Sequence, residues 1–296
     1  MYSPRLEHLA ELQKQAPLAT LQIALNELDA KEKIRIADVV LGNRYLIQSL
    51  PFAKKLRWVQ SNSAGMDLIL SSPFAKLPFV LTSARGLYTP EIAEHAISLA
   101  FALARSLHLY RDDQKKGIWN RLPLTQISGA NCLLLGYGSI GQAIGKRLAA
   151  LGAHVFGVNK KDGDTWKELL PNTHFLFSTL PLTPLTHHLN SQPIFDRLPP
   201  HAFFISVGRG GVVDEQALLE KIRSFKLQGA ALDVFEEEPL PPHHPFWAEE
   251  RILLTPHVSR SPESTPNRWE PLFAENLGRF YREEPLLNLV DKEAGY

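Results

Sequence analysis

The sequence predicts an α/β protein with two domains, each built on a doubly wound parallel sheet. Three observations support this prediction. The chain has 296 residues, enough for two domains of about 150 residues each. Between residues 125 and 258, short apolar runs alternate with segments of helical period, and strands that run parallel need such helical connections. The first ninety residues repeat the alternation on a smaller scale.

The first ninety residues and the segment after them supply the elements of the smaller domain and one long helix. Apolar runs that each end in turn residues predict strands at 37–42, 56–61 and 78–83. The stretch from Pro90 to Arg105 predicts a helix, because apolar residues recur on one face and proline suits a first helical turn.

The following region predicts six strands, the number in a dinucleotide-binding doubly wound sheet. These strands are expected at 131–135, 154–158, 174–178, 202–206, 229–234 and 251–255. Two of the intervening segments place apolar residues at helical spacing on one face, namely Ile144, Leu148 and Leu151, and then Leu218, Ile222 and Phe225.

The end of the chain predicts that the smaller domain is discontinuous. A segment rich in Ser and Pro follows residue 258 and resembles a linker into a last helix, Pro271 to Tyr281. We expect this helix to return to the first domain. The expected domains are therefore 1–92 with 264–296, and an inserted domain at 93–263.

Charge, hydropathy and cysteine content exclude several classes of protein. Lys plus Arg number 32 against 31 for Asp plus Glu, so no basic surplus suits nucleic acid or an anionic membrane. The longest apolar run, Ala96 to Ala104, is far shorter than the roughly 20 residues that span a bilayer, and the N-terminus lacks a signal peptide's apolar stretch. The single cysteine, Cys132, lies in a predicted strand and is expected in the core. We expect a cytoplasmic protein without nucleic-acid or membrane partners.

A glycine-rich loop predicts a Rossmann dinucleotide-binding site. The segment Gly136-Tyr-Gly138-Ser-Ile-Gly141 follows a predicted strand and begins a predicted helix. Gly136 permits a sharp turn, Gly138 lets the backbone approach a pyrophosphate, and Gly141 packs helix against strand. The helix N-terminus attracts the anion. The residues expected to bind the cofactor here are Gly136, Gly138, Ser139, Ile140 and Gly141.

The end of the second strand of this region suggests NADP as the preferred cofactor, with NAD as the alternative. An NAD site usually carries Asp or Glu about twenty residues after the glycine loop, but this chain has Asn159 followed by Lys160 and Lys161. Asn does not repel a 2′-phosphate, and two ammonium groups attract it. The other interpretation is that both lysines are solvated turn residues.

Three later segments carry side chains suited to catalysis at the carboxyl ends of predicted strands, where open parallel sheets bind ligands. Arg209 stands between glycines, Glu238 follows two further glutamates, and His257 follows Thr-Pro. Singly, each has a commoner explanation: an arginine in a surface turn, a solvated acidic loop and a structural histidine. Their common sheet edge favours a shared site.

The sequence resembles the D-isomer-specific 2-hydroxyacid dehydrogenase family, and its glyoxylate and hydroxypyruvate reductases in particular. The resemblance covers most of the chain. It rests on SAGMD at 63–67, TPEIAEHAISLAFALAR at 89–105, LLLGYGSIGQAIGKRL at 133–148, SVGRGGVVDEQAL at 206–218, ALDVFEEEPLP at 231–241 and LLTPHVS at 253–259. It implies a Rossmann domain inserted in a smaller flavodoxin-like substrate domain. The implied reaction is NAD(P)H-dependent reduction of a small 2-oxo acid to the D-2-hydroxy acid.

The resemblance also implies roles for individual residues. Arg209 matches the arginine that binds the substrate carboxylate and carbonyl, Glu238 the catalytic glutamate, and His257 the acid/base. Ala64 and Gly65 match a loop whose backbone N–H groups hold the substrate carboxylate. Further positions expected near the cofactor are Val207, Asp233 and His257. Two departures are Asn159, where NAD-using members carry Asp, and Val258-Ser259, where a smaller pair is usual.

Two alternatives and two further expectations remain. A nucleotide-sensing interaction protein on the same fold would need the glycine loop but not the Arg–Glu–His set. The second alternative is a formate-type dehydrogenase. Glu238 argues against it, because the formate dehydrogenases that resemble this family carry glutamine at that position. We expect a homodimer in which residues 117–124 form an intersubunit arm. We predict no metal site, because the pairs His187-His188 and His243-His244 are expected to diverge in extended loops.

Overall fold

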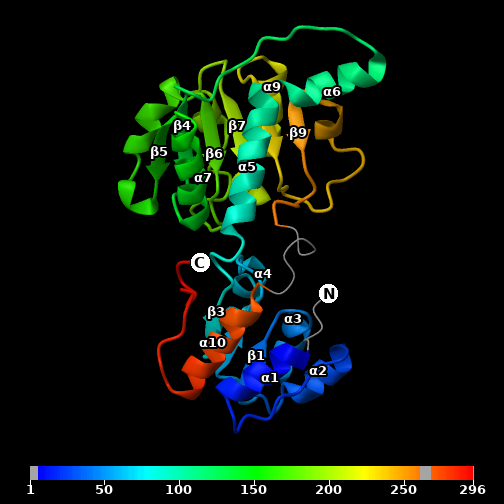
Figure 1. The fold of residues 1–296 in the computed structure, drawn as a ribbon, viewed down its shortest axis with the longest axis vertical. Coiled ribbons are helices and arrows are strands. Elements are labelled where there is room, and N and C mark those ends of the chain that lie inside the picture. The colour runs from blue at the N-terminus through cyan, green and yellow to red at the C-terminus, as the bar shows by residue number, and fades with distance from the viewer. Residues whose placement is uncertain (1–5, 261–267, 296) are drawn as a thin grey trace. The chain divides into compact units, whose positions relative to one another are not determined.

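The computed structural model describes residues 6–260 and 268–295 and divides into two compact units (Figure 1). Unit 1 comprises Met1–Leu87 and Pro262–Tyr296, and unit 2 comprises Tyr88–Ser261. The first boundary expected from the sequence, after residue 92, lies inside a helix that begins at Thr89. The second expected boundary, between residues 263 and 264, lies outside the described residues.

The sheet of unit 2 is parallel throughout, with its strands in the order β5-β4-β6-β7-β8-β9. All six strands expected from apolar runs are confirmed, each beginning or ending within two residues of its expected bounds. They are β4 Asn131–Leu135, β5 His154–Val158, β6 Phe175–Ser178, β7 Phe203–Ser206, β8 Gly229–Leu232 and β9 Ile252–Leu254. The chain leaves β4 to one side for β5 and to the other for β6, so the strand order reverses beside β4. Such a reversal is where open α/β sheets bind ligands.

Helices cover both faces of this sheet because successive strand side chains point to opposite sides. On one face, Cys132 and Leu134 of β4 pack with α5 and α7; on the other, Leu133 and Leu135 pack with α8 and α9. Figure 1 shows α5 and α7 crossing the strands on one side. The helices of unit 2 are α5 Thr89–Ala104, α6 Leu107–Lys116, α7 Ser139–Ala150, α8 Gln192–Phe195 and α9 Glu215–Arg223.

Two expected core positions of unit 2 are wrong. Leu151 is 39% exposed and Phe225 is 74% exposed, although helical spacing predicted both on buried faces. The reason is that α7 ends at Ala150 and α9 ends at Arg223. Phe225 has a φ of +58°, so the chain has already left the helix there and turned the ring outward.

Unit 1 contains a second parallel sheet, which confirms the three strands expected in the first ninety residues. β1 Val39–Leu41, β2 Trp58–Gln60 and β3 Val80–Thr82 pair in the order β1-β2-β3. Val59 and Leu81 are buried against Leu50 and neighbouring apolar side chains. The helices of this unit are α1 Leu6–Gln15, α2 Glu27–Lys33, α3 Leu46–Ser49, α4 Asp67–Leu70 and α10 Glu270–Tyr281.

The C-terminal helix α10 packs into unit 1 through a buried polar network. Asn276, fully buried on α10, donates from Nδ2 to Oε1 of Gln60 on β2 at 2.7 Å, and its Oδ1 accepts from Leu287 N at 2.8 Å. Thr82 donates to the same Gln60 oxygen at 2.8 Å and accepts from Trp58 Nε1. A side chain late in the sequence therefore completes the hydrogen bonding of the N-terminal sheet.

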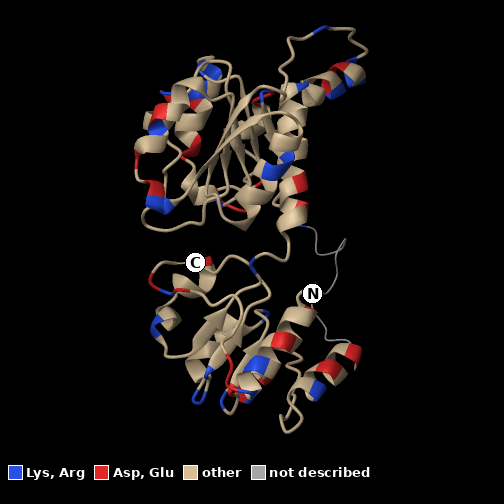
Figure 2. Ribbon diagram, turned by 60° about the vertical axis from the view of Figure 1, so that its left-hand side comes forward, with Lys and Arg blue, Asp and Glu red and all other residues tan. Residues whose placement is uncertain are grey.

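Charged side chains stay off the sheets. The described strands contain no Lys, Arg, Asp or Glu, and Figure 2 shows both signs of charge interspersed over the helices and loops. Among the described helices, none is both long enough and apolar enough to cross a membrane. The charged side chains that could take part in catalysis therefore lie outside the strands, and those of unit 2 considered next follow the strand ends.

Candidate active site

The glycine loop after β4 is built as the sequence predicts at Gly136 and Gly141. Gly136 has a φ of +90°, a left-handed conformation that favours glycine, and a Cβ there would lie 3.1 Å from the carbonyl carbon of Thr179. Thr179, after β6, donates its hydroxyl to Gly136 O at 2.7 Å. A Cβ on Gly141 would lie 2.5 Å from Gly136 O. These two glycines are therefore required by the protein's own packing.

Gly138 is different, because nothing in the described chain requires glycine there. Its φ is −81°, and a Cβ added to it would meet nothing within 4 Å. It is exposed and caps the N-terminus of α7, whose first residues, Ser139 and Ile140, have no intrahelical acceptors for their N–H groups. Open space over a bare backbone at a helix N-terminus fits an approaching phosphate. The loop thus fits the pyrophosphate of a dinucleotide cofactor.

The turn after β5 carries the residues expected to select the cofactor. Asn159 caps a short 3-10 helix, η3 Lys160–Asp162, and its side chain accepts from the backbone N–H of Asp162. In return, Asp162 accepts from Asn159 N at 2.7 Å. Lys160 and Lys161 are exposed. Sequence reasoning missed the Asp162 carboxylate, although Asn followed three residues later by Asp is a capping pattern.

The loops after β8 and β9 bring Glu238 and His257 together. His257 Nδ1 lies 2.7 Å from Glu238 Oε2, and Glu238 Oε1 accepts from Phe235 N at 3.0 Å. Because an ionised carboxylate can only accept, Nδ1 of the imidazole carries the proton of this hydrogen bond. The two side chains are 46% and 35% exposed. This geometry leaves Nε2 of His257 as the nitrogen available to a ligand.

The buried carboxylate of Asp233 anchors the turn that carries His257. His257 has a φ of +52°, a costly conformation for a residue other than glycine. Asp233 is fully buried and accepts from Val258 N and Ser259 N at 2.9 Å each. Both carboxylate oxygens thus anchor the two residues that follow His257.

Two more side chains complete the surroundings of Asp233. Thr255 donates its hydroxyl to Asp233 Oδ1 at 2.6 Å, and His95 Nε2, on α5, lies 3.0 Å from Thr255 Oγ1 and 3.4 Å from Asp233 Oδ1. Burial alone would raise the pKa of Asp233. The hydrogen bonds from His95, Thr255, Ser259 and Val258 outweigh burial and lower this pKa to about 2. Sequence reasoning placed Asp233 near the cofactor and did not identify His95.

Arg209 lies in the loop after β7, beside the loop that carries Glu238. Its Nη1 donates to Gly208 O at 2.9 Å, and the side chain is half-buried. A Cβ on Gly210 would lie only 1.9 Å from the carbonyl carbon of Phe235, so the two loops are in backbone contact. Since β7, β8 and β9 are neighbours in the sheet, Arg209, Glu238 and His257 leave the same sheet edge from three adjacent strands.

The remaining expected site residues lie as follows. The Val207 side chain is 5% exposed and belongs to the core, so only its backbone can face a ligand. Cys132 is fully buried, as expected, and burial raises the pKa of its thiol to about 12. Ala64 and Gly65 lie in unit 1, in the loop between β2 and α4, with Ala64 exposed.

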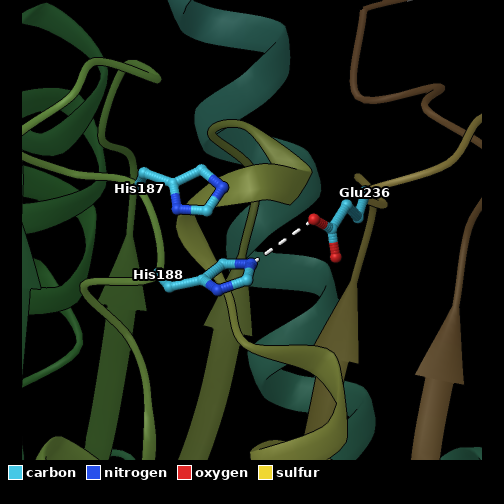
Figure 3. Close-up of side chains that lie close together, drawn as sticks. All are labelled: His187, His188 and Glu236. Carbon is cyan, nitrogen blue, oxygen red and sulfur yellow. Dashed lines mark ion pairs between the residues drawn. The ribbon is translucent and has the colours of Figure 1, made fainter.

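One expectation about the histidine pairs is wrong. His187 and His188 do not diverge: their rings stack with centroids 4.0 Å apart and planes 26° apart (Figure 3). The cause is backbone geometry, because His188 has a φ of +49° and the chain therefore turns instead of running extended. In the second pair, His244 accepts from Phe246 N and lies 3.3 Å from Glu215.

Comparison with known proteins places these features in a family context. The family model described as D-isomer specific 2-hydroxyacid dehydrogenase, NAD binding domain, matches residues 97–259. A glyoxylate reductase from Korarchaeum cryptofilum is 30% identical over 258 residues, which are 81% of this chain and 78% of the relative.

Solved structures resemble nearly the whole chain. A D-isomer specific 2-hydroxyacid dehydrogenase family protein from Aeromonas salmonicida has a TM-score of 0.84 and 34% identity, covering 97% of this chain and 96% of its own. An NADPH-dependent glyoxylate/hydroxypyruvate reductase from Sinorhizobium meliloti, solved with NADP and sulfate, has a TM-score of 0.85 and 28% identity. That likeness covers 98% of this chain and 96% of the other.

Proposed function

The chain belongs to the D-isomer-specific 2-hydroxyacid dehydrogenase family, and from that membership we propose that it reduces a small 2-oxo acid of the glyoxylate or hydroxypyruvate type to the D-2-hydroxy acid. It is an NAD(P)-dependent enzyme of this family. The observation that supports the proposed chemistry best is the 2.7 Å contact between His257 Nδ1 and Glu238 Oε2, at the same sheet edge as Arg209.

The proposed reaction adds a hydride and a proton to a carbonyl group. A dinucleotide cofactor, with its pyrophosphate held at the glycine loop, would supply the hydride and its two electrons to the carbonyl carbon. His257 donates the proton from Nε2 to the carbonyl oxygen as that oxygen gains negative charge, and the imidazole becomes neutral. Glu238 accepts the hydrogen bond from Nδ1 of His257, so it orients the ring and leaves Nε2 for the carbonyl oxygen.

The carboxylate of the substrate requires a separate set of donors. Arg209 presents a planar guanidinium, which can grip a carboxylate with paired hydrogen bonds and stays charged at every working pH. Ala64 and Gly65 are proposed to offer backbone N–H groups to the same carboxylate. Asp233 supports the proposed acid, because it fixes the two residues that follow His257.

We propose NADPH as the preferred cofactor. Asn159 puts no carboxylate of its own at the end of β5, and Lys160 and Lys161 are exposed there. The Sinorhizobium meliloti reductase was solved with NADP. The measurement that decides is the ratio of kcat/KM for NADPH and NADH. A clear preference for NADH would refute the assignment.

A substrate panel tests the proposed activity. Purified protein is mixed with NADPH and, separately, with glyoxylate, hydroxypyruvate and phenylpyruvate, and the oxidation of NADPH is followed by absorbance. We expect turnover with at least one of the two small acids and formation of the D-isomer from hydroxypyruvate. Turnover of none of these acids with either cofactor would contradict the proposal.

We also propose a cytoplasmic homodimer. The segment 117–124, after α6, carries Trp119 at 92% exposure and Ile118 at 51%, and exposed aromatic and aliphatic side chains are typical of interfaces. The single buried cysteine suits a reducing compartment. Light scattering tests the dimer. We expect twice the mass of one chain, and a monomer would exclude an intersubunit role for residues 117–124.

A further inference from the structure

Two adjacent histidines and a glutamate form a cluster apart from the Glu238–His257 pair. His187 and His188 lie in the loop between β6 and α8, and Glu236 lies after β8, four residues beyond its last residue (Figure 3). One ligand atom from each side chain lies within 4.8 Å of the other two. In the described part of the chain, no other three His, Cys, Asp or Glu side chains meet in this way.

The geometry of the three side chains is close to that of a metal site. A zinc ion bound at about 2.0–2.1 Å holds its nitrogen and oxygen ligands roughly 3.3 Å apart. His188 Nε2 and Glu236 Oε1 are already 3.4 Å apart. The His187 ring stacks on His188, so rotation about its side-chain bonds is what brings its nitrogen to the same point. His187 is exposed and therefore free to rotate.

One nitrogen of this cluster is shielded from solvent without a hydrogen bond. His188 Nε2 is shielded from solvent and makes no hydrogen bond within the described residues, although Glu236 lies at ion-pair distance. Buried polar atoms normally have a partner, and each exception calls for an explanation. An ion between the imidazole and the carboxylate would supply that partner.

The backbone holds two of the three side chains in place. His188 donates its N–H to Gly211 O at 3.0 Å, and Asn190 donates to Val212 O at 3.0 Å, which fixes the turn at its left-handed residue. Glu236 donates its N–H to Glu215 Oε1 at 2.9 Å. Preorganised ligands with supporting contacts are typical of metal sites.

The donor set selects the class of ion. Two imidazoles and one carboxylate suit zinc and other transition metals, whereas Mg²⁺ and Ca²⁺ prefer oxygen ligands. We propose that His187, His188 and Glu236 bind one divalent transition-metal ion such as Zn²⁺, with water at the remaining position. The ion would tie the loop between β6 and α8 to the segment that carries Glu238, two residues beyond Glu236.

Metal titration of the full chain, freed of any histidine tag, tests this site. Zn²⁺ is added during isothermal titration calorimetry, with Mg²⁺ in a parallel titration, and thermal unfolding is measured with and without Zn²⁺. We expect one equivalent of Zn²⁺ to bind, the unfolding midpoint to rise with Zn²⁺ concentration, and Mg²⁺ to have no effect. Absence of saturable Zn²⁺ binding, or equal binding of Mg²⁺, would overturn the proposal.

Three variants and a matched control locate the ion. His187→Ala, Glu236→Gln and His188→Asn should each weaken Zn²⁺ binding by at least about 10-fold; Asn is chosen because it tolerates the left-handed backbone at His188. The control is His201→Ala, since His201 and His174 form a ring pair with centroids 5.1 Å apart but belong to no such trio. Unchanged binding in the three variants, or an equal loss in the control, would show that the ion binds elsewhere. These readouts measure metal binding alone, so they do not depend on the proposed reaction.

Discussion

Two turns at the same edge of the unit 2 sheet are built in opposite ways. The turn after β9, with His257, rests on a fully buried carboxylate that anchors two backbone N–H groups and one hydroxyl. The turn after β5, with Asn159 and two lysines, is closed only by its own local hydrogen bonds and lies largely in solvent. The first holds one geometry, as a proton donor requires. Residues of the second turn can be substituted with little loss of folding stability, which suits residues that determine cofactor preference.

The largest effect is expected at His257, in the turn that the buried Asp233 carboxylate anchors. His257→Ala removes the proposed proton donor and should lower kcat for reduction by about 10²–10⁴-fold, whereas NADPH affinity, measured by fluorescence titration, should hardly change. His154→Ala is the matched control, since His154 is an exposed histidine at the start of β5 in the same sheet. Turnover of His257→Ala at the level of this control would remove the imidazole from the proposed mechanism.

Asp233→Asn tests whether the conformation of the His257 turn depends on the buried charge of Asp233. The side-chain amide of the introduced Asn keeps one acceptor oxygen, but its NH2 group is itself a donor. It therefore cannot accept hydrogen bonds from both Val258 N and Ser259 N. A pKa lowered from 3.8 to about 2 corresponds to about 2 kcal/mol of stabilisation by the ionised form. We expect the free energy of unfolding to fall by about this amount and kcat to fall with it. A variant as stable as the wild type would show that the anchor is dispensable.

The same carboxylate predicts a pH dependence of defined sign. The pKa of Asp233 is lower in the folded protein than its ordinary value of 3.8, so its stabilisation is complete above about pH 4 and is lost as the pH falls toward 2. The stability difference between wild type and Asp233→Asn, from urea unfolding at a series of pH values, should therefore be constant above pH 4 and shrink below it. A difference that grows on acidification would contradict this assignment.

The contrast between the turns also explains how far the sequence predicts the molecule. Strands such as 131–135 are predictable because an apolar run buried on both faces needs no knowledge of its neighbours. Glu238 and His257 are found because they follow strands whose ends share one edge. His95 is missed because its partner Thr255 lies 160 residues away, and no local pattern reports such a contact. His187 and His188 are misjudged because a single left-handed residue, His188 at φ +49°, changes where both rings point.

The smallest effect is expected at the exposed turn. Lys160 and Lys161 are solvated, and an exposed charge pair contributes less than about 1 kcal/mol, which is roughly a 5-fold change in an equilibrium constant. The double variant Lys160→Ala/Lys161→Ala should therefore lower kcat/KM with NADPH by about 5–10-fold and leave kcat/KM with NADH nearly unchanged.

Salt and stability separate this interpretation from a general loss of function. Since exposed charges are screened by added ions, the deficit of the double lysine variant with NADPH should diminish as ionic strength rises. Its thermal unfolding should match the wild type, because neither lysine packs against the core. If both cofactors lose activity equally, the lysines do not recognise the 2′-phosphate. If unfolding shifts as it does in Asp233→Asn, the two turns do not differ in their contribution to the fold.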